Sequence, residues 1–203
     1  HNPYPTLGKR LSEVFAHQAS SIIGLAPAVV YFDPAALLII MDYIDGHTLT
    51  KGDLNDHNLL LHVGDSLRRF HQLKITLPLK RSQLDRIKKY YTKARDKGIA
   101  FPSNFETVYT NYLKNEELVV KDTVICHGDL HPGNILVRNK SIFFVDWAGA
   151  TADDRFTDIG YMTLLSGMNN SQLTTFLRGY FGRIPTQEEL KKVQLAQAKT
   201  CFF

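Results

Sequence analysis

The stretch ICHGDLHPGNIL at residues 125–136 constrains the fold more than any other part of this sequence. Apolar residues typical of strands run up to Cys126 and resume at Ile135, whereas the residues between them are mainly His, Gly, Asp, Pro and Asn. Gly, Pro, Asn and Asp favour tight turns. The pattern therefore predicts a polar loop held between two short strands, with Asp129 and Asn134 five positions apart within it.

The residues around this loop predict a small β-hairpin between groups of helices. Strand signals appear in TVIC, NILV and SIFFVD, and the last two are joined by a turn at residues 138–140. Two earlier strands are expected in APAVVYFDP and LLIIMDYI, the second ending at Asp45. Apolar residues at helical spacing predict helices over residues 7–23, 53–73 and 82–98.

Polar residues mark where further helices begin. Ser103 is followed three residues later by Glu106, which is a capping-box signature, so a fourth helix is expected from Ser103. After Asp146 the chain is expected to be helical again, with Ser171 and Thr186 as the capping residues of two helices. This order of elements predicts an α+β fold with a helical majority.

The residue types in the loop match the requirements of phosphoryl transfer. A hydroxyl group that attacks a phosphate needs a proton acceptor on a rigid turn, and the phosphates need divalent cations, which prefer oxygen ligands. Protein kinases place the base and a metal-binding Asn in H-R-D-x-x-x-x-N, and His127, Asp129 and Asn134 have the same spacing. Asp146 ends the following strand, where that template needs a second carboxylate for the metal ions.

The segments HGDLHPGN, FFVDW and DRFTDIG resemble the phosphotransferase family of aminoglycoside, choline, ethanolamine and thiamine kinases, which share the protein-kinase-like fold. Upstream, RLSEVF resembles the R-x-x-E opening of the family's first helix, and LIIMDYIDG resembles its approach to the nucleotide hinge. These upstream segments are most similar to the bacterial choline-kinase-like branch. The resemblance implies a helical C-terminal lobe with a small β-hairpin at the catalytic site, and transfer of the γ-phosphate of ATP with Mg²⁺ as cofactor.

The resemblance also implies roles for residues of the catalytic loop and its neighbours. Asp129 is expected to be the catalytic base, and Asn134 and Asp146 are expected to be magnesium ligands. Asp158, in the helix that follows, is expected to brace the loop through its backbone. His127 is expected to orient the loop by hydrogen bonding rather than to take part in the chemistry.

By the same resemblance, three upstream residues are expected to bind nucleotide. The Asp42 carbonyl and the Ile44 amide fall where the family holds adenine, and Glu13 corresponds to the helix carboxylate that pairs with a phosphate-binding lysine. That lysine is a departure from the family pattern, because no strand or glycine-rich loop fits before Glu13. Lys9 is four residues away from Glu13 and is expected on the same helix.

The expected division of the chain follows from this departure. Residues 1–46 are expected to be a remnant of the N-terminal nucleotide-binding lobe plus the hinge, with most of that lobe missing. Residues 47–203 are expected to form the C-terminal catalytic and substrate-binding lobe, and the apolar CFF at its end falls within an expected helix.

Composition limits the partners of the chain. The formal net charge of +4 suits an anionic ligand but is too small for a nucleic-acid surface, and no stretch has the length of a membrane span. Cys126 and Cys201 fit no metal or redox spacing, so free buried thiols in a reducing compartment are expected. We therefore expect a cytoplasmic protein without nucleic-acid partners or membrane insertion, and the sequence leaves its oligomeric state open.

Three functions remain compatible with the sequence. The first is phosphorylation of a small cationic alcohol similar to choline, the second is phosphorylation of an aminoglycoside or of thiamine, and the third is a kinase-like binding module without catalysis. Two clusters are given no role in the site. A basic cluster is expected to be a solvated helix face: Lys80, Arg81, Arg86, Lys88 and Lys89. An aromatic cluster is expected in the core: Tyr90, Tyr91, Tyr109 and Tyr112.

Overall fold

The computed structural model describes residues 6–78, 82–118 and 122–202 of the chain. Within these ranges the helices are α1 (Leu7–Ile22), α2 (His57–His71), α3 (Gln83–Asp96), α4 (Phe105–Leu118), α5 (Phe156–Leu165), α6 (Asn170–Phe181) and α7 (Gln187–Thr200). Three short 3₁₀ turns lie between them: η1 (Asp53–Asn55), η2 (Pro132–Asn134) and η3 (Trp147–Gly149). No described helix combines the length and the apolar character that are needed to cross a membrane.

The strands form three small antiparallel sheets. The first joins β1 (Val29–Asp33) to β2 (Leu38–Met41), the second has the order β3 (His47–Thr48), β5 (Ile135–Arg138), β6 (Ser141–Phe144), and the third joins β4 (Thr123–Cys126) to β7 (Thr151–Asp154). The predicted hairpin is present as β5 and β6, with Asn139 and Lys140 at positive φ in its turn. Neither β3 nor β7 was expected from the sequence.

The expectation of helix directly after Asp146 is wrong because the chain first returns to pair with β4. Thr151 lies opposite Cys126 in this pairing, and Asp154 lies opposite Thr123. The sequence TADD has little β propensity of its own, so its strand conformation comes from the ladder to β4. The loop after β4 and the turn at η3 are thereby held next to each other, since both lie at the same end of this sheet.

Helix ends agree with the sequence only in part. Thr186 and Glu189 form the expected capping box of α7, whereas α6 begins after Asn169 rather than Ser171 because Asn169 forms a capping box with Gln172. The prediction that α4 begins at Ser103 is wrong, since the helix begins at Phe105. Glu106 accepts a hydrogen bond from the Tyr91 hydroxyl at 2.5 Å, which ties α4 to α3.

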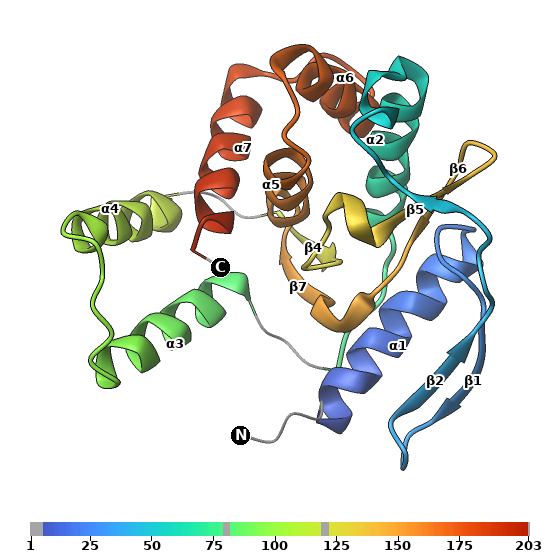
Figure 1. Cartoon of the computed structure of the whole chain (residues 1–203), viewed down its shortest axis with the longest axis horizontal. Coiled ribbons are helices and arrows are strands. Elements are labelled where there is room, and N and C mark those ends of the chain that lie inside the picture. The colour runs from blue at the N-terminus through green and yellow to red at the C-terminus, as the bar shows by residue number, and fades with distance from the viewer. Residues whose placement is uncertain (1–5, 79–81, 119–121, 203) are drawn as a thin grey trace.

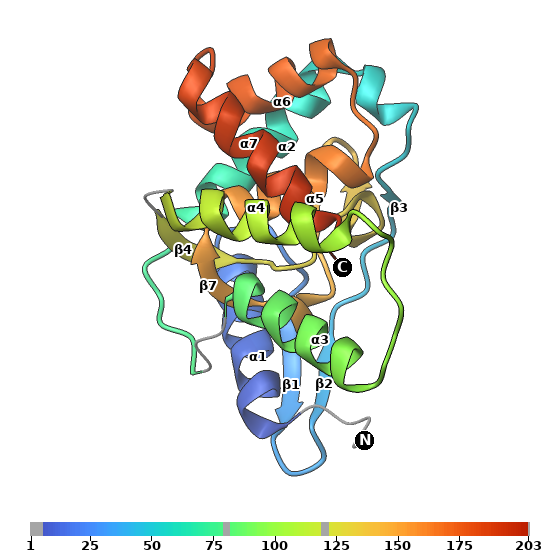
Figure 2. The same cartoon turned by 90° about the vertical axis from the view of Figure 1, so that its left-hand side faces the viewer.

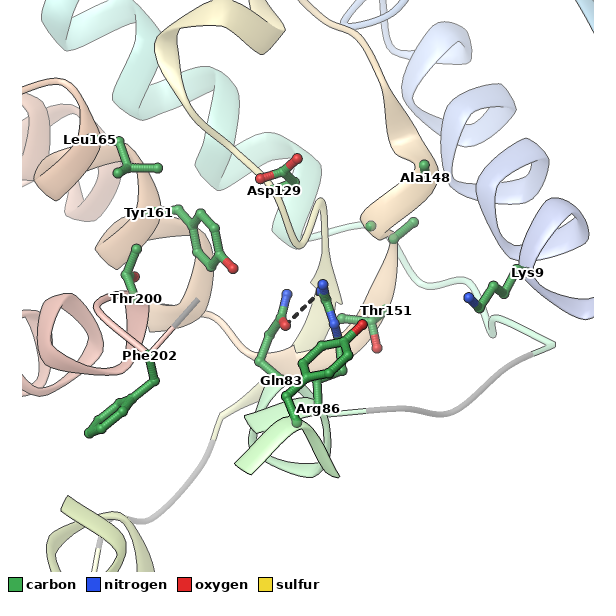
Figure 3. Close-up of a pocket in the computed structure, with 13 residues that line it drawn as sticks. Lys9, Gln83, Arg86, Asp129, Ala148, Thr151, Tyr161, Leu165, Thr200 and Phe202 are labelled. Carbon is green, nitrogen blue, oxygen red and sulfur yellow. Dashed lines mark hydrogen bonds between the residues drawn. The ribbon is translucent and has the colours of Figure 1, made fainter. Parts of the chain in front are cut away.

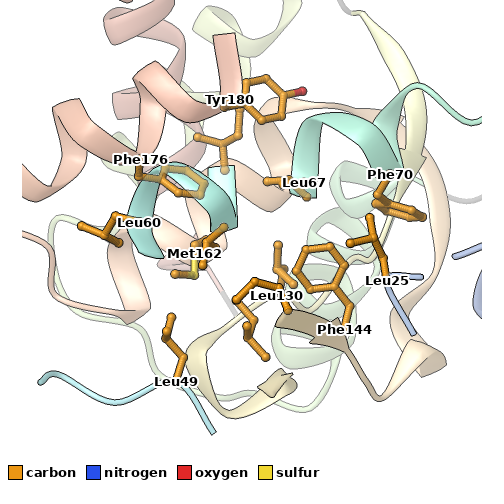
Figure 4. Close-up of a cluster of buried hydrophobic side chains, with 14 of the residues drawn as sticks. Leu25, Leu49, Leu60, Leu67, Phe70, Leu130, Phe144, Met162, Phe176 and Tyr180 are labelled. Carbon is orange, nitrogen blue, oxygen red and sulfur yellow. The ribbon is translucent and has the colours of Figure 1, made fainter. Parts of the chain in front are cut away.

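The main core lies where α2, α5 and α6 meet the β5–β6 hairpin (Figure 4). Gly64 on α2 and Gly179 on α6 allow these two helices to approach until backbone touches backbone, because a Cβ at Gly64 would overlap the Phe176 carbonyl and one at Gly179 would overlap the Leu61 carbonyl. Fully buried side chains of this core include Leu60, Leu67, Phe70, Leu130, Ile135, Phe144, Trp147, Met162 and Phe176.

Two views at right angles show how the elements are arranged around this core. Figure 1 shows α1 with the β1–β2 hairpin at the lower right, α2, α6 and α7 at the top, α5 near the centre, and α4 and α3 at the left, with α3 below α4. Figure 2, turned by 90°, shows α3 and α4 at the front of the molecule with the C-terminal end of α7 beside them. The β4–β7 sheet and the predicted loop therefore lie in the middle, between α1 and the α3–α4 pair.

Candidate active site

Asp158, in the first turn of α5, holds the backbone of the loop that follows β4. Its carboxylate accepts hydrogen bonds from the backbone amides of His127 at 2.7 Å and Gly128 at 2.8 Å. His71 Nε2 donates to the same carboxylate at 3.0 Å, and the Tyr180 hydroxyl donates to His71 Nδ1 at 2.7 Å. Burial alone would raise the pKa of Asp158, but the hydrogen bonds from His71 and Gly128 and the nearby His127 lower it.

Two glycines let this loop contact the turn at η3. Gly128 has a φ of 77°, which glycine adopts without steric cost, and a Cβ at this position would overlap the Gly149 carbonyl oxygen. Gln83, at the start of α3, donates from Nε2 to the Gly128 carbonyl at 2.6 Å. The loop is therefore fixed from α3, α5 and η3 at once.

His127 links the loop to the strand that leads to Asp146. Its Nε2 donates to the Val145 carbonyl at 2.9 Å, and its ring lies 4.7 Å from that of Trp147. Burial lowers the pKa of His127, and the nearby Asp158 opposes this effect. A neutral, fully buried ring held in this way fits an orienting role better than proton transfer.

Asp129 and Asn134 are held together by the loop itself. Asn134 Nδ2 donates to the Asp129 backbone carbonyl at 2.9 Å, which leaves the side-chain oxygen of Asn134 available to other partners. The Asn134 carbonyl accepts from the Val145 amide at 3.0 Å, so Asn134 is adjacent to the residue that precedes Asp146. The Asp129 carboxyl is half buried, and burial raises its pKa.

Asp146 lies where the β6 strand turns into η3. It has a φ of 63°, a left-handed conformation that Asp and Asn tolerate better than other residues with side chains. Its charge raises the pKa of Asp129 and also that of Glu13, after the larger effect of burial in each case. Glu13 on α1 and Asp129 in the loop after β4 are therefore each near enough to Asp146 for its charge to act on them, although the three residues are far apart in the sequence.

The three residues expected at a nucleotide lie along the α1 side of the molecule. Glu13 is part-buried on α1, where it forms an ion pair with Arg10 of the same helix at 2.7 Å. Its partner is therefore a nearby arginine rather than a lysine from a separate strand. Asp42 and Ile44 lie in the irregular segment between β2 and β3, where β2 ends at Met41 and not at Asp45 as the sequence suggested. The Asp42 amide donates to the Ala28 carbonyl at 2.9 Å.

An open cavity of about 690 Å³ lies beside the loop, between α1, α3 and α5 (Figure 3). Asp129 faces it, as do the end of α7 and the segment from Ala148 to Thr151. Its described lining residues are Lys9, Gln83, Arg86, Tyr90, Asp129, Ala148, Gly149, Ala150, Thr151, Tyr161, Leu165, Thr200 and Phe202. The cavity is large enough for a small organic molecule with one reactive group next to Asp129.

Sequence reasoning missed several residues of this cavity. Arg86 belongs to the basic cluster that was expected to be solvated, yet its guanidinium reaches the cavity and donates to Gln83 Oε1 at 2.8 Å. Tyr90 lines the cavity and is half exposed rather than buried in a core, unlike Tyr109 and Tyr112. Lys80 and Arg81 lie outside the described residues. The sequence offered one signal for this: Gln83 and Arg86 are three residues apart, a spacing that places two side chains on the same face of a helix.

Both cysteines are free, as expected, but Cys201 is exposed and only Cys126 is buried. Cys126 lies with His71 and Asp158 in a group whose potential ligand atoms are within 4.8 Å of one another. Burial raises the pKa of the Cys126 thiol, and both nitrogens of His71 already make hydrogen bonds. A protonated thiol and an occupied imidazole do not form a metal site, so this group stabilises the fold.

Solved structures show that this chain shares its fold with kinases of small molecules. A choline/ethanolamine kinase family protein from Mesorhizobium loti superimposes with a TM-score of 0.86 at 21% identity, covering 95% of this chain and 68% of that one. The choline kinase LicA from Streptococcus pneumoniae superimposes with a TM-score of 0.76 at 20% identity, covering 98% of this chain and 74% of that one.

The sequence itself identifies the family. The model of the phosphotransferase enzyme family matches residues 11–192, so this chain belongs to that family. Protein LicA of Haemophilus influenzae is 25% identical over 159 residues, which cover 76% of this chain and 47% of that protein. The chain thus spans about half the length of this relative.

Proposed function

We propose that this chain carries the catalytic site of a small-molecule kinase, which transfers the γ-phosphoryl group of ATP to a hydroxyl group. The observation that carries the proposal is that Asp129 lines a cavity of about 690 Å³, while Asn134 donates to its backbone carbonyl and the charge of Asp146 raises its pKa. The family supports this chemistry, and a LicA structure similar to this chain was solved in complex with AMP.

In this proposal Asp129 is the catalytic base. Its carboxylate accepts the proton of the acceptor hydroxyl while the acceptor oxygen bonds to the γ-phosphorus, the bond from that phosphorus to the bridging oxygen breaks, and ADP leaves. Asp158, His127 and Gly128 contribute by fixing the loop, because a rigidly placed base needs no reorganisation when the reaction occurs.

Asn134 and Asp146 are the proposed magnesium ligands. The amide nitrogen of Asn134 is used by the Asp129 carbonyl, so the amide oxygen is the atom left for a cation, and Asp146 adds an anionic oxygen. Two oxygen donors of this kind fit Mg²⁺, which keeps several waters and completes its shell with substrate phosphates. When bound, Mg²⁺ would neutralise charge on those phosphates.

We propose that the nucleotide lies toward residues 1–46 and the acceptor toward residues 47–203. The adenine would contact the Asp42 carbonyl and the Ile44 amide, since neither group makes a backbone hydrogen bond to another described residue. Glu13 would lie near the phosphates, because it is close enough to the proposed metal ligand Asp146 for the charge of Asp146 to raise its pKa.

For the acceptor, we propose an amino alcohol similar to choline, because the similar proteins are described as choline and ethanolamine kinases. An aminoglycoside or thiamine is the alternative acceptor, since an aminoglycoside-3'-phosphotransferase shares the fold with a TM-score of 0.68. All these acceptors have a hydroxyl group beside a positive charge.

The proposal is tested by following ADP formation from ATP with choline, ethanolamine, thiamine and an aminoglycoside as acceptors. We expect transfer to at least one acceptor, and Asp129→Asn should lower kcat by about 10²–10⁴-fold with little change in KM for ATP. Asn keeps the size of the side chain and most of its hydrogen bonds, so folding should be retained. A substrate that is phosphorylated equally well by Asp129→Asn would remove Asp129 from this role.

One observation favours a second candidate, a kinase-like module that binds a ligand without catalysis. Glu13 is paired with Arg10 of the same helix and not with a lysine from a strand, which leaves the phosphate-binding ion pair of kinases unaccounted for among the described residues. A chain that binds ATP but transfers phosphate to no acceptor would favour this second function.

A further inference from the structure

Gln83 is a fully buried side chain that connects α3 to the catalytic loop. It is the first residue of α3, and none of its surface is exposed. Its side-chain nitrogen Nε2 donates to the Gly128 carbonyl at 2.6 Å, and its side-chain oxygen accepts from Arg86 at 2.8 Å. Both ends of the buried amide group are therefore hydrogen-bonded, which fixes how the side chain lies.

The start of α3 is anchored to the core by a buried ion pair. The backbone amide of Gln83 donates to the Asp153 carboxylate of β7 at 2.6 Å, and Lys199 Nζ of α7 lies 3.5 Å from the same carboxylate. The side chains of Asp153 and Lys199 are both buried. Amides in the first turn of a helix have no partner within the helix, and the helix dipole favours a carboxylate there. The backbone of Gln83 is thus held by β7 and α7, so its side chain has a fixed starting point.

The Gly128 carbonyl belongs to the peptide group that precedes Asp129. Gly128 has a φ of 77°, and glycine adopts many backbone conformations at little cost, so Gly128 itself does little to keep this peptide group in one orientation. The Gly128 amide is held by Asp158 at 2.8 Å, and the Asp129 carbonyl is held by the Asn134 side chain at 2.9 Å. The bond from Gln83 fixes the group between them, the Gly128 carbonyl. The direction of the Asp129 side chain depends on the orientation of this peptide group.

We propose that Gln83 is a positioning residue for phosphoryl transfer, which holds the Gly128–Asp129 peptide group so that the Asp129 carboxyl faces the acceptor hydroxyl. Figure 3 shows the Gln83 side chain extending from α3 toward the loop that carries Asp129. Gln83 acts through the base and takes no part in the chemistry itself. A misplacement of about 1 Å in an active site can cost about 10²-fold in rate. This inference rests on the proposed kinase function and adds to it a residue outside the sequence motifs.

The test replaces Gln83 by methionine, which has a similar length but cannot donate to the Gly128 carbonyl. Gln83→Met keeps the backbone bond to Asp153. With ATP and an acceptor that the unaltered chain phosphorylates, we expect kcat to fall by about 10- to 100-fold and KM for ATP to change little. Gln83→Glu is the second variant, in case the first does not fold. It should also lower kcat, because a carboxylate oxygen would face the carbonyl oxygen in place of a donor.

A double variant distinguishes positioning of the base from a general loss of structure. If Gln83 acts through Asp129, Gln83→Met should lower kcat much less in the Asp129→Asn background than in the unaltered chain. An equal loss in both backgrounds would overturn the inference, because it would show a structural role that is independent of the base. An unchanged kcat would also overturn it. So would an effect confined to KM for the acceptor, which would make Gln83 a contact of the acceptor.

Gln197→Met is the matched control. Gln197 is a part-buried glutamine of α7 whose Nε2 donates to Thr163 Oγ1 of α5 at 3.0 Å, and it is not among the described residues that line the cavity. The same replacement there removes one hydrogen bond between helices without touching the catalytic loop. It should lower the melting temperature and leave kcat unchanged. A loss of kcat as large as that of Gln83→Met would contradict the inference.

Hydrogen exchange distinguishes failure of this inference from failure of the kinase function, since it needs no acceptor. The backbone amides of residues 126–131 report how firmly the loop is held. Gln83→Met should raise their exchange, and Gln197→Met should not. If no acceptor is phosphorylated but exchange changes in this way, Gln83 holds the loop and the proposed reaction is wrong. Unchanged exchange of this segment in Gln83→Met overturns the inference.

Discussion

The Asp129 carboxyl illustrates how a single residue acquires its properties from its surroundings. It is half buried, and burial together with the charge of Asp146 raises its pKa, while His131, His127 and Arg86 act in the opposite direction. A carboxylate with a raised pKa is a stronger base than an ordinary aspartate.

This environment predicts the pH dependence of the reaction. The base must be deprotonated, so kcat/KM should fall as the pH drops through the pKa of Asp129, which is above the ordinary value of about 3.9 for aspartate. His131→Asn removes a nearby positive charge that lowers this pKa, while Asn can still accept the hydrogen bond from the Gly133 amide. The acid limb should therefore move to higher pH in the variant.

The measurement is the pH profile of kcat/KM for both proteins at saturating Mg²⁺. An acid limb of the unaltered chain at or below the ordinary pKa of aspartate would contradict the prediction. So would a shift to lower pH in His131→Asn.

At the scale of elements, the packing of α2 against α6 depends on two glycines. Gly64 and Gly179 lie where the backbones of the two helices touch, and added methyl groups would overlap the carbonyl oxygens of Phe176 and Leu61. His71 and Tyr180 lie further along the same pair of helices and support Asp158. The spacing of α2 and α6 thus affects the catalytic loop.

Gly64→Ala should destabilise the chain by about 1–3 kcal/mol, because the obstacle is backbone that cannot rotate away. Gly8→Ala is the matched control, since Gly8 also lies in a helix but has no atom within 4 Å of its added Cβ. There the better helix propensity of Ala should leave stability unchanged or slightly raised. Urea denaturation of both variants provides the comparison, and equal midpoints would show that the helices are not in close contact.

At the scale of the whole molecule, the fold brings together Glu13, Asp129 and Asp146 from three separate parts of the chain. Burial raises the pKa values of Glu13 and Asp129, and repulsion from Asp146 raises both further. A divalent cation would relieve this repulsion, so binding of ATP and Mg²⁺ should depend on each other.

Calorimetric titration with ATP should therefore show tighter binding when Mg²⁺ is present. Asp146→Asn should lose most of this difference, because a hard cation loses an anionic ligand while Asn tolerates the positive φ of this position. Asp96→Asn, on the exposed end of α3, should keep the full effect. Equal affinity with and without Mg²⁺ in the unaltered chain would contradict the assignment of the ligands.

The amino-acid sequence by itself determined the local parts of this site. The loop after β4, the β5–β6 hairpin and the spacing of Asp129, Asn134 and Asp146 were predictable, because turn residues and alternating strands act over a few positions. The family followed from the same segments. The roles of these residues stay predictions until they are measured.

Only the tertiary structure decided the contacts between distant segments. β7 forms because its polar residues pair with those of β4. Gln83 is 45 residues from Gly128 and 70 from Asp153, yet it holds both and positions Arg86 at the cavity. Such contacts depend on where the helices pack, and the periodicity of a single helix does not contain that information.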